Sequence, residues 1–188
     1  MQQARPIGRA FLFFRSISRQ VIAPIFEAGF GLIRYSDPMF DVLVYLYEHY
    51  WRSDACPDSD MLARKLSAVG FEADEIREAL AWLDGLSEAT QDQGIDPADS
   101  SIRVYSGVEL EHVGPEALGF LRFLESAGVL SPRMREVVLD RALVVPGGPI
   151  ALDDLKVIVL MVFWSLGEEP DALILDELFA DDECRQIH

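Results

Sequence analysis

The segment at residues 39–51 limits what this chain can fold into more than any other feature. Its sequence, MFDVLVYLYEHYW, is apolar almost all round, with three polar interruptions. A helix that is apolar on every side lies at the centre of a core or in an interface with a partner. Asp37 and Pro38, directly before it, make a suitable N-cap and first-turn pair. The segment therefore predicts a central helix that begins just after Asp37.

Most of the remaining apolar residues recur with a helical period. They predict helices over residues 59–69, 72–85, 114–127, 131–144, about 153–167 and 170–179. Gly70 is placed as a left-handed C-cap, and Ser131-Pro132 as an N-cap pair. Residues 102–106 alternate and form the one strand-like stretch. The expected fold class is all-α: two small helical lobes with helix-turn-helix-like hairpins, and one short strand or hairpin near residues 102–106.

Acidic residues outnumber basic residues by two to one, and they are unevenly placed. The chain has 32 Asp and Glu against 16 Lys and Arg, which gives a formal net charge of −16. Residues 1–38 carry five arginines and two acidic residues, a charge of +3, whereas the other 150 residues carry −19. We expect four parts: an N-terminal extension at 1–38, an N-terminal helical lobe at 39–86, an acidic linker at 87–101 and a C-terminal helical lobe at 102–188.

The N-terminal extension has the pattern of a basic amphipathic helix. Apolar residues from Phe11 to Ile25 share one half of a helical wheel, and arginines from Arg9 to Arg19 take the other half. Segments of this kind lie on anionic lipid or serve as organelle transit peptides. The interpretation that we favour is an upstream start, with the native protein beginning at Met39.

Five stretches of the chain resemble the Smg family of bacterial proteins. They are MFDVLVYLYEHYW, GFEADEIREALAWL, GFLRFLESAGVL, REVVLDRAL and LDDLKVIVLMVFW, in the family's order and spacing over residues 39–188. Members of that family begin at the equivalent of Met39, which supports the upstream-start interpretation. The resemblance implies neither an established activity nor a catalytic residue. Because the family's genes often lie near one for a DNA-processing protein that acts in DNA uptake, it does imply a link to DNA processing.

A helix-turn-helix unit is the first candidate functional site. Residues 62–83 contain two predicted helices joined by a turn with glycine, so the second helix would be the one that reads DNA. Its exposed face carries Arg77 and five carboxylates, which are Glu72, Asp74, Glu75, Glu78 and Asp84. Five carboxylates repel a polyanion. We therefore interpret the unit as a packed helical hairpin.

Nucleic-acid binding has a second candidate in the arginines of the C-terminal lobe, which are Arg122, Arg133 and Arg141. Acidic residues are interleaved with them, a mixture typical of a solvated face with local ion pairs. Affinity for phosphate depends on Lys and Arg, and the chain has an acidic balance. Nucleic-acid binding is therefore the alternative function and not the expected one.

Motifs for catalysis or metal binding are missing from the sequence. The chain has no GxSxG, GxxxxGK[ST] or GxGxxG motif, and His112 has no serine or cysteine placed as its nucleophile. His49, Cys56, Cys184 and His188 are zinc-ligand types, but no CxxC pair is present. We expect no catalytic residue, no cofactor, no metal and no small-molecule substrate. Two cysteines and no apolar run of about 20 residues indicate a cytoplasmic protein without a transmembrane segment.

Protein binding is the function that remains. The acidic residues of the 72–85 helix and of the linker steer a basic partner, because complementary charge raises association rate and specificity. Tyr45, Tyr47 and Trp51 supply aromatic anchors for an interface, or else they form the core between the lobes, which is the interpretation that we favour. The expected function is a non-enzymatic protein–protein interaction factor with an acidic surface. Its expected partner is basic and handles nucleic acid.

Overall fold

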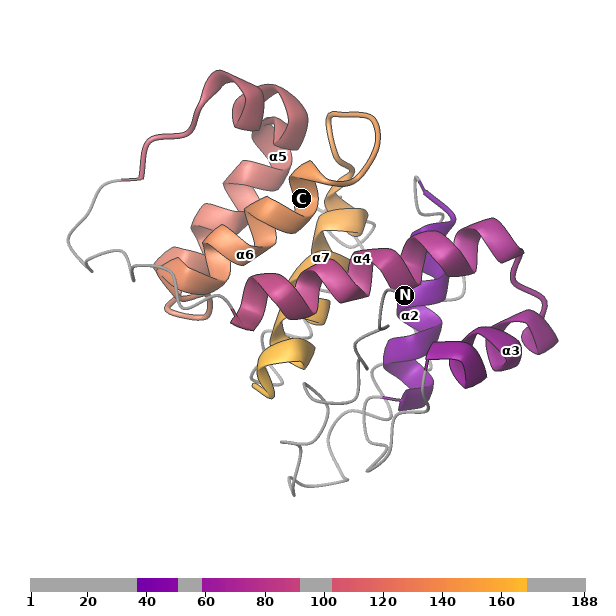
Figure 1. Ribbon diagram of the computed structural model, residues 1–188. Helices are drawn as coiled ribbons and strands as arrows, with labels where there is room; N and C mark the ends of the chain where they lie inside the picture. The colour runs from indigo at the N-terminus through magenta and orange to yellow at the C-terminus, as the bar shows by residue number, and fades with distance from the viewer. Residues whose placement is uncertain (1–36, 51–58, 92–102, 169–188) are drawn as a thin grey trace, which may run out of the picture.

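The computed structural model describes residues 37–50, 59–91 and 103–168. Within these ranges the chain forms six α-helices and no strand (Figure 1). The helices are α2 Met39–Tyr50, α3 Ser59–Val69, α4 Ala73–Gln91, α5 Gly107–Ser126, α6 Pro132–Leu143 and α7 Leu152–Leu166. The expected all-α class is confirmed. Residues 1–36 of the N-terminal extension and the helix predicted at 170–179 lie outside the described ranges.

Two strongly apolar helices form the centre of the fold. Every residue of α7 from Val157 to Trp164 is buried, and the helix packs against α2, α4, α5 and α6 (Figure 1). Helix α2 buries seven of its 12 residues, with Phe40 and Leu43 fully enclosed. A helix without a polar face is stable in water only when other elements cover it. The prediction that the 39–51 segment is central is confirmed for its described residues.

Several helix ends lie where the sequence predicts them, because local chemistry fixes them. The Asp37 carboxylate accepts a hydrogen bond from the backbone N–H of Met39 at 2.9 Å, as an N-cap does. The Ser131 hydroxyl does the same for the N–H of Met134 at 3.3 Å, with Pro132 as the first helical residue. Gly70 has φ +117° and donates to the Ser67 carbonyl, while the next residue bonds back to α3, so this end is a Schellman motif.

Helix α4 is longer than the sequence predicts. It continues six residues past Gly85, the expected end, to Gln91. Leu86 is buried, and the Thr90 hydroxyl donates to the Leu86 carbonyl at 2.9 Å, so the last turns are held both by packing and by hydrogen bonds. The predicted linker at 87–101 is therefore wrong at its start, where residues 87–91 are helical. Residues 92–101 lie outside the described residues.

The strand expected at residues 102–106 is not found in its described part. Residues 103–106 are not helical, but none of the described segments pairs with them as a strand. Ser106 instead caps α5 together with Glu109, in a capping box that starts the helix at Gly107. The alternating pattern fits an extended chain, but a strand also needs a neighbour with which to share hydrogen bonds.

Helix α5 consists of two helical stretches that meet at Gly114. This residue has φ +77° and ψ +164°, a conformation that only glycine adopts readily. The predicted helix start at Gly114-Pro115 is therefore confirmed for the second stretch. The first stretch, residues 107–113, is a helix that was not predicted from the sequence.

The helices on either side of the predicted linker share one core. Helix α4 packs against α2 and α3 and also against α6 and α7. Trp82 of α4 is buried among them, and its indole N–H donates to the Arg141 carbonyl of α6 at 3.2 Å. The described part of the chain thus has one continuous hydrophobic cluster. The boundary expected near residue 86 does not separate two cores.

Candidate functional site

Helix α4 presents a row of carboxylates to solvent. Asp74, Glu78, Asp84 and Glu88 are all exposed and lie opposite its buried residues Ile76, Ala79, Trp82 and Leu86. The exposed Glu72 directly precedes the helix. We call these five carboxylates the acidic face. Of the five acidic residues singled out from the sequence, Asp74, Glu78 and Asp84 share the exposed side of α4, and Glu72 is exposed just before it. The structure adds Glu88, which was expected in the linker.

The acidic face is almost without neutralising charge. Arg77 forms an ion pair with Asp74, but both side chains are more than two-thirds exposed, so the pair contributes little. Among the described residues, no cation lies within 4.0 Å of Glu78, Asp84 or Glu88. Burial, followed by the charge of Glu88, raises the pKa of Asp84 above its usual value. Mutual repulsion between carboxylates is therefore part of the native structure.

Glu75, the fifth predicted carboxylate, lies on a different side of α4. It is half-buried and accepts a hydrogen bond from the backbone N–H of Glu72 at 3.0 Å. It also lies close enough to Asp41 of α2 that burial, and then the charge of Glu75, raises the pKa of Asp41. The negative field thus extends from α4 to α2. No sequence signal connects Asp41 to this site, because the relation depends on how α2 and α4 pack.

The aromatic residues of α2 belong mainly to the core. Tyr47 is buried, and Tyr45 is half-buried, with its ring stacked on His49 at 3.9 Å and edge-on to Phe71 at 5.5 Å. The core interpretation therefore holds for Tyr47, which is not exposed to a partner. Trp51, the third predicted anchor, lies outside the described residues.

The three arginines of the alternative nucleic-acid site have other contacts. Arg133 donates to the Thr90 carbonyl of α4 at 3.1 Å, and the side chain of Arg141 lies over Gly85 of the same helix. Two of the three thus join α6 to α4. The guanidinium of Arg122 lies 5.5 Å from the ring centre of Tyr105.

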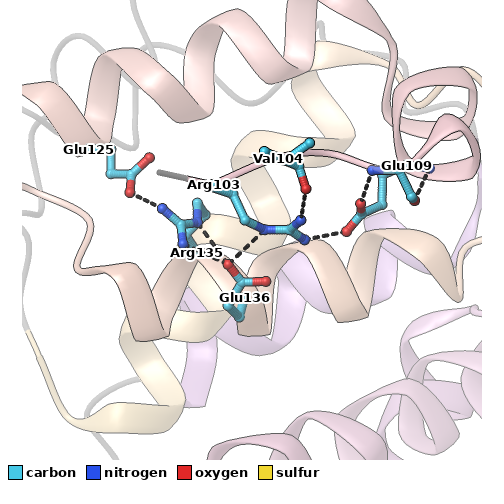
Figure 2. A network of polar contacts seen from close by, with 7 residues as sticks. Arg103, Val104, Glu109, Glu125, Arg135 and Glu136 are labelled. Carbon is cyan, nitrogen blue, oxygen red and sulfur yellow. Dashed lines mark hydrogen bonds and ion pairs between the residues drawn. The ribbon is translucent and has the colours of Figure 1, made fainter. Parts of the chain in front are cut away.

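A network of charged side chains fastens the segment before α5 to α6 (Figure 2). Arg103 donates to Glu136 at 3.0 Å and also pairs with Glu109, while the buried Arg135 pairs with Glu125 and with Glu136 at 2.7 Å. Each carboxylate of this network has a guanidinium partner, so the network holds the chain in place and offers no free acid or base. This network was not predicted from the sequence, although Ser106 and Glu109 have the spacing of a capping box.

These contacts shift the pKa values of two members of the network. Burial alone would raise the pKa of Glu109, but hydrogen bonds from Ser106 and Arg103 and the charge of Arg103 outweigh it and lower that pKa. Burial likewise opposes the charge of Arg103, yet its hydrogen bonds to Glu136 and Glu109 raise its pKa. Both groups are thus held in their charged forms.

The histidines have contacts that fix local structure. His112 Nε2 donates to the Ala142 carbonyl at 3.2 Å, and the His112 carbonyl accepts from the Ile150 N–H at 2.8 Å, so this residue holds the turn between α6 and α7. His49 Nδ1 donates to the Tyr45 carbonyl at 2.9 Å. Its three suggested zinc-ligand partners lie outside the described residues, and within the described ranges no group of three or more potential ligands is placed to hold a metal.

No described helix is both long enough and apolar enough to span a bilayer.

Comparison with known proteins assigns the chain to a family. A family model described as "Protein of unknown function (DUF494)" matches residues 39–188. The chain belongs to the Smg family. A protein Smg homolog from Methylibium petroleiphilum and another from Leptothrix cholodnii are each 65% identical to it over 150 residues, which is 80% of this chain and all of each relative. The Smg homolog of Herminiimonas arsenicoxydans is 53% identical, over 77% of this chain and 95% of its own length. No solved structure matches the chain.

Proposed function

We propose that this Smg-family chain is a non-enzymatic protein–protein interaction factor whose acidic face binds a basic, nucleic-acid-handling partner. The observation that carries the proposal is the row formed by Glu78, Asp84 and Glu88, none of which forms an ion pair with a described residue. A surface of one charge attracts a partner of the other charge and speeds its association. The link to nucleic-acid handling rests on the gene neighbourhood implied by the family resemblance.

The raised pKa of Asp84 supports a partner that is positively charged. Burial of the Asp84 carboxylate, and then repulsion from Glu88, raises this pKa, so the ionised pair costs free energy in the isolated protein. A lysine or arginine placed between the two carboxylates removes that cost and lowers the pKa of Asp84 on binding. A partner of the wrong charge adds to the cost, so the same surface selects against acidic proteins and nucleic acids.

The alternative function, nucleic-acid binding through helix-turn-helix-like units, has less support in the geometry. The helix in the recognition position carries the acidic face. Arg133 and Arg141 are engaged with α4, so binding phosphate would require them to leave those contacts.

The experiment is a comparison of partner capture by the full chain and by two charge-reversal variants. The test variant is Glu78→Lys/Asp84→Lys, on the acidic face. The matched control is Glu116→Lys/Glu168→Lys, which makes the same change in net charge at exposed positions elsewhere. We expect a basic protein to be captured from native cells by the wild type and the control but not by the test variant, and to be released as salt screens the interaction.

Two outcomes contradict the proposal. One is that the wild type captures no protein above background, and the other is that both variants capture the same proteins as the wild type. A gel shift with residues 39–188 at low salt tests the alternative. A shift at micromolar protein that Glu78→Lys/Asp84→Lys strengthens would favour direct nucleic-acid binding instead.

A further inference from the structure

A second surface, formed by the segment before α5 and by α5 itself, has the opposite chemistry. Val104 is 78% exposed and Val108 is 70% exposed, and both flank the half-buried Tyr105. On the second stretch of α5, Phe123 is 49% exposed beside the exposed Arg122. The contact between Arg122 and Tyr105 brings these two segments together. We call these five residues the arginine–apolar face.

Arg122 differs from its neighbours in having no carboxylate partner. The adjacent Arg103 pairs with both Glu109 and Glu136. Among the described residues, by contrast, no acidic group lies within salt-bridge distance of Arg122, whose guanidinium lies over the Tyr105 ring. The guanidinium of Arg103 also lies over the Tyr105 ring, 5.0 Å from its centre, but it is paired with Glu109 and Glu136. Among the described residues, Arg122 is therefore the exposed arginine on this ring that is available to bind an anion.

The composition of this face is that of a binding site for a protein segment. Arginine and aromatic residues dominate the energetics of interfaces, and exposed apolar side chains that gather in one place mark interaction sites. Cation–π contact with Tyr105 holds the Arg122 guanidinium in place, which reduces the entropy lost when it pairs with a carboxylate.

We propose that the arginine–apolar face binds a peptide segment of a partner protein that carries apolar residues next to an Asp or Glu. The apolar residues of the segment cover Val104, Val108 and Phe123, and its carboxylate pairs with Arg122. Charge complementarity with Arg122 decides the chemistry of this occupant. The inference is independent of the acidic face, which attracts the opposite charge and lies on another helix.

The test uses the full chain and a display library of random peptides, without assuming a particular partner. We expect the selected peptides to combine apolar residues with Asp or Glu. For a labelled selected peptide, fluorescence anisotropy should show that Arg122→Glu weakens binding at least about tenfold, a typical loss for a central charged contact. Val108→Asp should weaken binding similarly.

A matched control separates the local contact from net charge. Arg64→Glu, at an exposed position of α3, changes the net charge by the same amount and should leave the affinity unchanged. Unchanged circular dichroism and melting temperature in Arg122→Glu show that the fold is intact. Loss of acidic-face function in Glu78→Lys/Asp84→Lys should not alter binding of the selected peptide, so the two proposals can fail separately.

Several results would overturn the inference. They are no enrichment of any peptide, enrichment of basic peptides alone, and equal affinity for wild type and Arg122→Glu. The inference would also be overturned if the arginine–apolar face bound a second copy of the chain or another segment of the same chain. A dimer in sedimentation that Arg122→Glu abolishes would assign the face to a second copy of the chain, and a photo-crosslinker at position 108 that captures another segment of the same chain would assign it to that segment.

Discussion

The guanidinium group of Arg141 lies directly over Gly85, so that α6 approaches α4 at a point where α4 has no side chain. A Cβ atom added at Gly85 would overlap the Arg141 guanidinium, which also pairs with Asp140 at 2.7 Å. Nearby, the indole of Trp82 donates to the backbone carbonyl of Arg141. The Arg141 guanidinium thus occupies the space over a glycine inside a helix, where helix propensity alone disfavours glycine.

We expect Gly85→Ala to stabilise the protein by less than the roughly 1 kcal/mol that the change provides in an open helix. The methyl group forces the Arg141 guanidinium to move, and because that side chain is largely buried and paired with Asp140, the movement offsets part of the gain. In an Arg141→Ala background, Gly85→Ala should recover the full gain. Urea unfolding of the four proteins in this cycle measures the difference, and equal gains in both backgrounds would show that the overlap has no energetic effect.

Gly114→Ala should instead destabilise the protein, with a loss of at least about 2 kcal/mol in the free energy of unfolding. Its φ of +77° strains any residue with a side chain, and the added Cβ would lie 2.9 Å from Cβ of Pro149. The control is Gly119→Ala on the same helix, where a Cβ meets nothing within 4 Å. That change should stabilise the protein by up to about 1 kcal/mol. A Gly114→Ala variant as stable as the wild type would contradict the strained conformation.

The contrast between these glycines shows why the sequence predicts some helix ends and not others. Local signals fix the start of α6 at Ser131-Pro132 and the end of α3 at Gly70, and both are as expected. Gly85 resembles a stop signal in the same way, yet α4 continues past it because Leu86 packs into the core, and Arg141, 56 residues later in the chain, occupies the space that a side chain at Gly85 would need. A contact between distant segments outweighs a local preference, and a single sequence does not record such contacts.

The candidate site, too, could be predicted from the sequence only in part. Helical periodicity alone places Asp74, Glu78 and Asp84 on one exposed face, and the structure agrees. The approach of Asp41 to Glu75 depends on the packing of α2 against α4 and had no local signal. Segment 103–106 has an alternating pattern but pairs with no strand among the described residues, and Arg103 fastens it to Glu136 of α6 instead.

Asp84→Asn should stabilise the protein at pH 7 by a few tenths of a kcal/mol, the usual size of a like-charge effect on a helix surface. Burial and the charge of Glu88 raise the pKa of Asp84 above 3.8, so the folded state binds its proton more tightly than the unfolded state does. The cost of ionised Asp84 is therefore present at neutral pH and is lost as the pH falls through the raised pKa. Chemical unfolding from pH 7 to pH 3 should show the advantage of the variant disappearing, and in a Glu88→Gln background the advantage should be smaller throughout.

Glu109→Gln should destabilise the protein at pH 7 by about 1 to 2 kcal/mol, because it weakens both the capping box of α5 and the ion pair with Arg103. The pKa of Glu109 is lowered from 4.5 in the folded state, so its contribution is complete above that unfolded value. It is lost as the pH falls through the lower, folded value. The difference between variant and wild type should thus be constant from pH 7 to about pH 5 and shrink in more acidic solution. Glu116→Gln, at an exposed position of the same helix, is the control and should change stability by less than about 0.5 kcal/mol. A Glu109→Gln loss that stays the same at all pH values would mean that the carboxylate acts through its shape and not through its charge.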